Sequence, residues 1–151
     1  TINTPTISEY ANKGIILDNY YVQPICTPTR CALMSGRYPI HTGLQHGVIR
    51  DSVPDALPLT LKNKSVILMP EYLKKNSNND YETHMIGKWH LGFYLRKYTP
   101  QERGFDHFYG YYTGNEEYWN HTSPCWNCGN FTAIDLGYHN KTTDIFDLDE
   151  G

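Results

Sequence analysis

The first third of the chain changes from a helical to a β-prone hydrophobic pattern and back. Residues 4–13 carry a proline near their start and precede a glycine, which predicts a short helix. Residues 15–22 are rich in β-branched and aromatic side chains, so we expect a strand there. A second helix is expected over residues 28–35, with Gly36 as its C-terminal cap.

In the middle of the chain the pattern predicts a long loop, then a helix, then a strand. Residues 39–64 are interrupted by glycines and prolines, which predicts mostly loop. The apolar positions of residues 65–75 share one helical face, although Pro70 limits how early a regular helix begins. Residues 81–86 form a second expected strand, which ends at Gly87. The alternation predicts an α/β layered fold.

The last third is aromatic and is expected to be rich in loops, above all over residues 119–151. The length of 151 residues suits one domain with a real core, and we expect no internal boundary. No apolar run approaches the length of a transmembrane helix. The net charge of −3 and the isoelectric point near 6.1 argue against nucleic-acid binding, which favours a basic surface.

Four Asn-x-Ser/Thr sequons suggest glycosylation and passage through the secretory pathway, to a lysosomal or extracellular destination. Three of them fall in the last thirty-odd residues, although an Asn- and Thr-rich composition alone could produce them. The candidate sites are Asn63, Asn120, Asn130 and Asn140.

The four cysteines allow three disulfide pairings. Cys125 and Cys128 form a Cys-x-x-Cys motif in a polar stretch that lacks the βαβ context of a redox site. It also lacks the second pair of a zinc site, although His121 and His139 lie near in sequence. A local disulfide between Cys125 and Cys128 in an oxidising compartment is the preferred interpretation. Cys31 is expected to be a small core residue.

The segment from Cys26 to Arg30 carries the strongest candidate chemistry. Pro28 suits the first turn of a helix, so Cys26 and Thr27 are expected at or just before a helix N-terminus. Arg30 follows Cys26 by four residues and can lie on the same side of that turn. Free N–H groups and a partial positive charge at the helix end favour an anion. This arrangement predicts a pocket for a reactive group beside a tetrahedral oxyanion.

A second candidate group follows the strand expected over residues 81–86. Lys88 and His90 are two positions apart, so in an extended segment both side chains face the same way while Trp89 turns into the core. Lysine suits an oxyanion as a point charge, and an imidazole can transfer protons near neutral pH. We expect both residues at the mouth of the pocket.

Four stretches of the chain resemble the type I sulfatases, and among these the arylsulfatase B (N-acetylgalactosamine 4-sulfatase) group. The resemblance extends over residues 3–118 and is strongest over residues 17–37, 41–46, 83–92 and 103–106. It implies that residues 1–151 are an incomplete N-terminal portion of a catalytic domain. The implied fold is an alkaline-phosphatase-like α/β/α sandwich with a mostly parallel mixed sheet.

The resemblance also implies a sulfuric ester hydrolase that acts on sulfated sugars of glycosaminoglycans, such as an N-acetylgalactosamine 4-sulfate. In this family a formylglycine-generating enzyme oxidises the motif cysteine, here Cys26, to formylglycine. The modified Cys26 would also be a ligand of a bound divalent cation, usually Ca²⁺. Arg30 would hold the hydrated aldehyde, while Lys88 would bind the substrate sulfate and share the active site with His90.

Two alternatives stay open on the residues alone: a phosphonate or phosphodiester hydrolase of the same superfamily, and a non-catalytic glycan-binding relative. The other cation ligands of the family are expected outside these 151 residues. A hard cation needs about six oxygen ligands or more. We therefore expect this chain by itself to bind metal poorly and to show little or no turnover.

Overall fold

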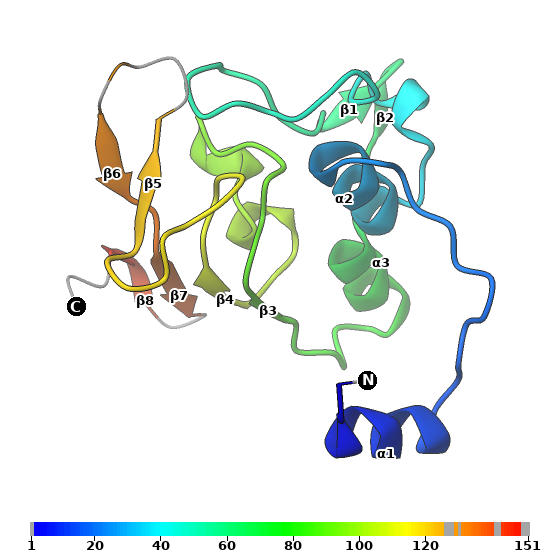
Figure 1. Cartoon of the computed structure of the whole chain (residues 1–151). Helices are drawn as coiled ribbons and strands as arrows, with labels where there is room; N and C mark the ends of the chain where they lie inside the picture. Colours follow the sequence, from blue (N-terminus) through cyan, green and yellow to red (C-terminus); the bar gives the residue numbers. More distant parts are fainter. Residues whose placement is uncertain (1, 126–128, 130, 141–142, 149–151) are drawn as a thin grey trace.

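The computed structural model describes residues 2–125, 129, 131–140 and 143–148, and it combines helices with a mixed sheet (Figure 1). No helix in this described part is both long and apolar enough to cross a membrane. The elements are α1 (Pro5–Lys13), α2 (Cys26–Ser35), η1 (Pro39–His41), β1 (Thr60–Leu61), β2 (Lys64–Ser65), α3 (Met69–Asn76), β3 (His84–Ile86), η2 (Arg96–Tyr98), η3 (Gln101–Arg103), β4 (His107–Gly110), β5 (Thr122–Pro124), β6 (Thr132–Ile134), β7 (Gly137–Asn140) and β8 (Thr143–Leu148).

The three α-helices confirm the predicted helical segments, with shifted starts. Helix α2 begins at Cys26, two residues earlier than expected, and ends at Ser35. Gly36 caps it with a φ of 63°, the left-handed conformation. Helix α3 begins only at Met69, with Pro70 in its first turn. The side chain of Glu71 accepts a hydrogen bond of 2.6 Å from the Leu68 N–H, which satisfies one orphan donor of that turn.

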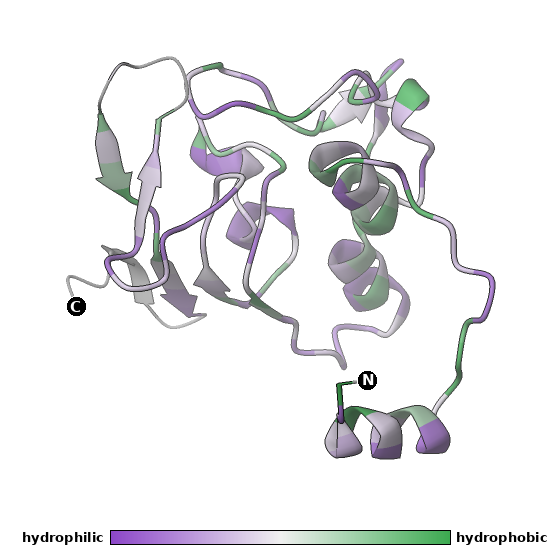
Figure 2. Cartoon of the chain, in the orientation of Figure 1, coloured by the Kyte–Doolittle hydropathy of each residue, from purple (hydrophilic) through white to green (hydrophobic). Residues whose placement is uncertain are grey.

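The strand expected over residues 15–22 is absent from the structure. The chain runs instead as an extended connection between α1 and α2, and its hydrophobic start stands out in Figure 2. Ile15, Ile16 and Leu17 are exposed, at 89%, 61% and 65%. A strand forms only where a neighbour pairs with its N–H and C=O groups, and no described strand lies beside this segment.

The main sheet has the order β3-β4-β7-β8. Strand β3 confirms the strand predicted over residues 81–86 in shortened form, and it pairs with β4 in parallel. The pairings β4–β7 and β7–β8 are antiparallel, so the sheet is mixed as predicted, but parallel pairs are in the minority. Strands β5 and β6 form a separate antiparallel pair.

Strands β5 to β8 lie within residues 119–151, which the sequence predicted to be rich in loops. They are three to six residues long, and their sequences mix Thr, Gly and Asn with few aliphatic side chains. Such strands lack the alternation that identifies a half-buried strand from sequence. Pairing with β4 and with one another, rather than local propensity, fixes their conformation.

One hydrophobic core joins α2 to the sheet. Cys31 and Met34 from α2 meet Met85 of β3 and Phe108 of β4, and Cys31 is fully buried as predicted. Trp89, directly beyond β3, is also fully buried, and its indole N–H donates to the Gly92 carbonyl at 2.9 Å. This core holds the N-terminal turn of α2 against the segment that follows β3.

Candidate active site at the start of helix α2

A cavity of about 430 Å³ lies at the N-terminal turn of α2. Cys26 and His90, which are 64 positions apart in sequence, both line it. Cys26 is half-buried and carries a free thiol. The remaining lining residues are Ile25, Val48, Ile49, Arg50, Asp51, Gly114 and Asn115. The structure thus brings together two of the residues that the sequence identified separately.

Arg30 joins α2 to the segment after β3. Its Nε donates to the Trp89 carbonyl at 2.7 Å, and its Nη2 donates to the Lys88 carbonyl. Burial lowers the pKa of Arg30 from its ordinary value, while the nearby Tyr111 and Cys26 raise it. Arg30 is a cation because a guanidinium does not lose its proton in proteins. Two of its donors bind backbone carbonyls that the sequence did not link to Arg30.

The segment after β3 keeps pairing with the chain beyond β4. The Gly87 N–H donates to the Tyr109 carbonyl at 2.8 Å. The N–H groups of Trp89 and His90 donate in the same way, to Tyr111 at 2.9 Å and to Tyr112 at 3.1 Å. His90 has a φ of 54°, in the left-handed region that side-chain-bearing residues seldom adopt. The expected extended geometry therefore ends before His90, and the strained turn carries the ring to the cavity.

His90 is neutral near pH 7. Its side chain is only 4% exposed. Burial lowers the pKa of His90 to about 4, and the hydrogen bond to Ile49 opposes this shift. The positive charges of Lys88 and Arg30 lower the pKa further. Nε2 lies 2.8 Å from the Ile49 carbonyl. Because a carbonyl can only accept, Nε2 carries the proton and Nδ1 is the acceptor. Nδ1 is buried and has no hydrogen-bond partner among the described residues.

Thr27 is a positioning residue that sequence reasoning did not single out. It is fully buried, and its hydroxyl donates to the His90 carbonyl at 3.3 Å while accepting from the Ile49 N–H at 3.1 Å. The same side chain thus holds both the backbone of His90 and the residue whose carbonyl binds the His90 ring. Its only sequence signal is its place between Cys26 and Pro28 in the motif.

Lys88 is not among the described residues that line this cavity, but it contacts one of them. Its Nζ donates to the Gly114 carbonyl at 2.7 Å, and Gly114 is one of the lining residues. A Cβ placed on Gly114 would lie 2.9 Å from Cε1 of His90, closer than carbon atoms pack. Gly114 therefore allows the loop to approach the imidazole while its carbonyl orients the lysine.

The cavity holds few ligands for a hard cation. The oxygen-bearing side chains that line it beside Cys26 are Asp51 and Asn115. Calcium takes six to eight oxygens, so the described residues do not form a calcium site by themselves. Ca²⁺ at Cys26 stays a prediction.

The predicted glycosylation and disulfide sites stay predictions. Asn63 and Asn120 are exposed, and Asn140 is half-buried. Cys125 is disulfide-bonded. The predicted glycosylation of Asn130 and the pairing of Cys125 with Cys128 involve residues outside the described ranges, so both stay predictions.

Comparisons with known proteins agree on one family. The family model described as Sulfatase matches residues 1–148. Arylsulfatase J of Mus musculus is 48% identical over 120 residues, which are 80% of this chain and 19% of that protein. N-acetylgalactosamine-6-sulfatase of Homo sapiens is 32% identical over 115 residues, covering 71% of this chain and 20% of the relative.

A solved structure gives the same result. The PsFucS1 sulfatase from Pseudoalteromonas sp. superposes with a TM-score of 0.55 at 34% identity, and the match covers 76% of this chain and 21% of that one. This chain therefore spans about a fifth of the length of the relatives that it matches.

Proposed function

This chain belongs to the sulfatase family, and we propose that the protein containing it hydrolyses sulfate esters at the side chain of residue 26. The observation that carries the proposal is the shared cavity of Cys26 and His90, with the cations of Arg30 and Lys88 beside it. A sulfate ester is an anion, so two neighbouring cations favour its binding and stabilise charge on its oxygens.

The chemistry that we propose needs a hydroxyl nucleophile in place of the thiol. Oxidation of Cys26 by a formylglycine-generating enzyme supplies an aldehyde, which water converts to a carbon bearing two hydroxyls. One hydroxyl attacks sulfur and the alcohol leaves with a proton. Loss of the proton from the second hydroxyl then re-forms the aldehyde and expels sulfate. Covalent catalysis of this kind divides one difficult displacement into two easier steps.

His90 is suited to the proton transfers of this scheme. It is uncharged near pH 7, and its tautomer is fixed because Nε2–H donates to the Ile49 carbonyl. Its Nδ1 has no partner within the described part of the chain, and a hydroxyl on residue 26 would supply a donor. The Nζ of Lys88 provides a point charge for a sulfate oxygen once it leaves the Gly114 carbonyl.

The substrate that we propose is a sulfated sugar of a glycosaminoglycan. One relative carries the name N-acetylgalactosamine-6-sulfatase, which supports a sugar. We further propose that the protein passes through the secretory pathway to the lysosome or the extracellular space, carries glycans at its sequons, and completes a Ca²⁺ site with ligands from beyond this chain.

The test is turnover of an aryl sulfate by the full-length protein, compared with Cys26→Ala and with Cys26→Ser. We expect turnover by the wild type and a loss of about a thousandfold or more in both variants, since neither can form the aldehyde. An aryl phosphodiester assayed in parallel distinguishes the phosphodiesterase alternative. Equal turnover by wild type and Cys26→Ala would overturn the proposal.

A further inference from the structure

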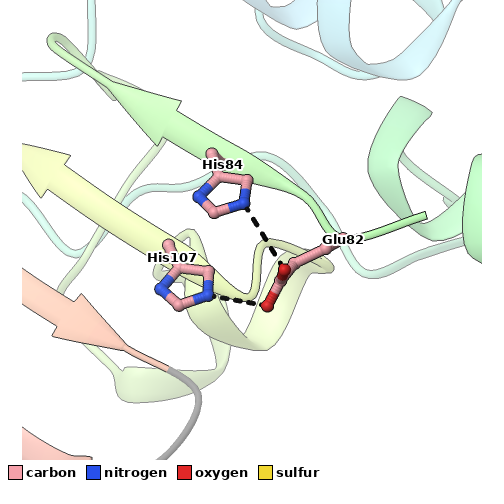
Figure 3. A group of neighbouring side chains, drawn as sticks. All are labelled: Glu82, His84 and His107. Atoms are coloured by element: carbon pink, nitrogen blue, oxygen red, sulfur yellow. Dashed lines mark hydrogen bonds and ion pairs between the residues drawn. The ribbon is translucent and has the colours of Figure 1, made fainter.

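Three side chains of types that can bind metals lie together at the start of β3, at the opposite end of that strand from the cavity. Glu82, His84 and His107 each offer one ligand atom, and these atoms lie within 4.8 Å of one another. One oxygen of Glu82 lies 3.0 Å from Nε2 of His107, and the other lies 3.9 Å from Nε2 of His84 (Figure 3). The two imidazoles stack with centroids 4.4 Å apart.

The pairing of β3 with β4 fixes this arrangement. His84 and His107 are direct partners in the parallel register, and adjacent strands lie about 4.8 Å apart. Glu82 precedes His84 by two positions, so both side chains fall on the same face, whereas Thr83 and Met85 between and after them are buried. The three ligands therefore share one sheet face because of the pleat and the register.

A half-buried carboxylate network holds the backbone beneath the cluster. Asp106 accepts hydrogen bonds from the Thr83 N–H and hydroxyl, both at 3.0 Å, and pairs with Lys74 of α3 at 2.7 Å. The His107 N–H donates to the Thr83 carbonyl at 3.1 Å. Thr83 lies between Glu82 and His84, and Asp106 precedes His107, so these hydrogen bonds link the backbone at all three side chains to one another and to α3. Such support is what keeps metal ligands oriented.

We propose that Glu82, His84 and His107 form a binding site for a zinc-class transition-metal ion, separate from the cavity at α2. Two imidazole nitrogens and one carboxylate are a ligand set typical of Zn²⁺, with the fourth tetrahedral position left to water. Calcium prefers six to eight oxygens, and this cluster offers one carboxylate. The site therefore selects a different class of metal from the one expected near Cys26.

To hold the ion, the His84 ring must turn out of its stack with His107, because a bound metal lies in the plane of each imidazole and the two planes are only 5° apart. Ligands of a tetrahedral zinc ion lie about 3.3 Å apart, given bond lengths of about 2.0–2.1 Å. The contact between Glu82 and His107 is already at 3.0 Å, and the 3.9 Å separation between Glu82 and His84 must shorten by about 0.6 Å. The side chains of Glu82 and His84 are more than half exposed, so they can rotate to close this gap.

The experiment titrates the full-length protein, treated with a chelator and dialysed, with Zn²⁺ in a calorimeter. We expect His84→Ala and His107→Ala each to remove one binding event, or to weaken it about tenfold or more, since each deletes one of three ligands. His41→Ala is the matched control, because His41 is exposed and lies outside the cluster, and it should leave the isotherm unchanged. Zinc X-ray absorption should also lose imidazole scattering in the two cluster variants.

Identical isotherms for wild type, His84→Ala and His107→Ala would overturn the proposal. Loss of binding in the His41→Ala control would overturn it as well, since the bound ion would then depend on a different histidine. Circular dichroism of each variant checks that the fold is intact. Glu82→Gln gives a second measure: it keeps the shape of the side chain but removes the charge, and Zn²⁺ affinity should fall while the metal-free melting temperature changes little.

Discussion

Arg30 is expected to stabilise the fold by joining α2 to the segment after β3, and its replacement tests this directly. Arg30→Met keeps much of the apolar stem but removes the donors to the carbonyls of Trp89 and Lys88. Each hydrogen bond from a charged group contributes about 1.5–3 kcal/mol, and an unpaired buried carbonyl costs a similar amount. Because Arg30 is half-buried, we take the lower values and expect a loss of about 3 kcal/mol.

Urea denaturation measures this loss. With a slope of about 2 kcal/mol per molar urea, the midpoint should fall by about 1.5 M. Arg30→Lys keeps a charge but presents a single ammonium to two carbonyls, so it should recover about half of the difference. Arg37→Met is the control: Arg37 is exposed, and its replacement should change stability by no more than about 0.5 kcal/mol. Equal midpoints for Arg30→Met and Arg37→Met would refute the reasoning.

Three further predictions follow from the same site. The pKa of His90 is lowered from 6.5 to about 4 on folding, so its neutral form favours the fold above pH 6.5 and this stabilisation, at most about 3 kcal/mol, is lost as the pH falls to 4. His90→Gln should flatten that part of the stability–pH curve, and an unchanged curve would contradict the assignment. Gly114→Ala places a methyl 2.9 Å from the His90 ring and should cost about 1–3 kcal/mol, whereas Gly47→Ala, which meets no atom within 4 Å, should cost far less in the same melt. The isolated 151-residue chain should show no turnover of an aryl sulfate that the full-length protein hydrolyses, and measurable turnover by the isolated chain would contradict the expectation of missing ligands.

The sequence predicted the elements whose signals are local. Helix α2 and its glycine cap follow from Pro28, which fixes its own φ, and from Gly36, which allows the left-handed cap conformation. The prediction of a strand over residues 15–22 was wrong, because a strand forms only beside a partner strand and the described residues place none there. Hydrophobic pattern alone does not distinguish a paired strand from an extended connection.

The candidate site was predictable in its residues but not in its contacts. Cys26 and His90 were both identified from their motifs, and the structure places them on one cavity. The role of Thr27 and the use of Arg30 on backbone carbonyls were not predictable, since both depend on contacts about 60 positions away in sequence. The left-handed φ of His90 was not predictable either, because the spacing of Lys88 and His90 suggested an extended segment and tertiary contacts fix the actual turn.

The central claim is that residue 26 is an aldehyde in the active protein, and peptide mass spectrometry of protein from its native source tests it most directly. Trypsin cleaves after Lys13, Arg30 and Arg37, so Cys26 and Cys31 fall in the separate peptides 14–30 and 31–37. After denaturation and alkylation, Cys31 should carry the alkyl group, while peptide 14–30 should resist alkylation and form a hydrazone. An alkylated thiol at position 26 in all copies of peptide 14–30 would contradict the account.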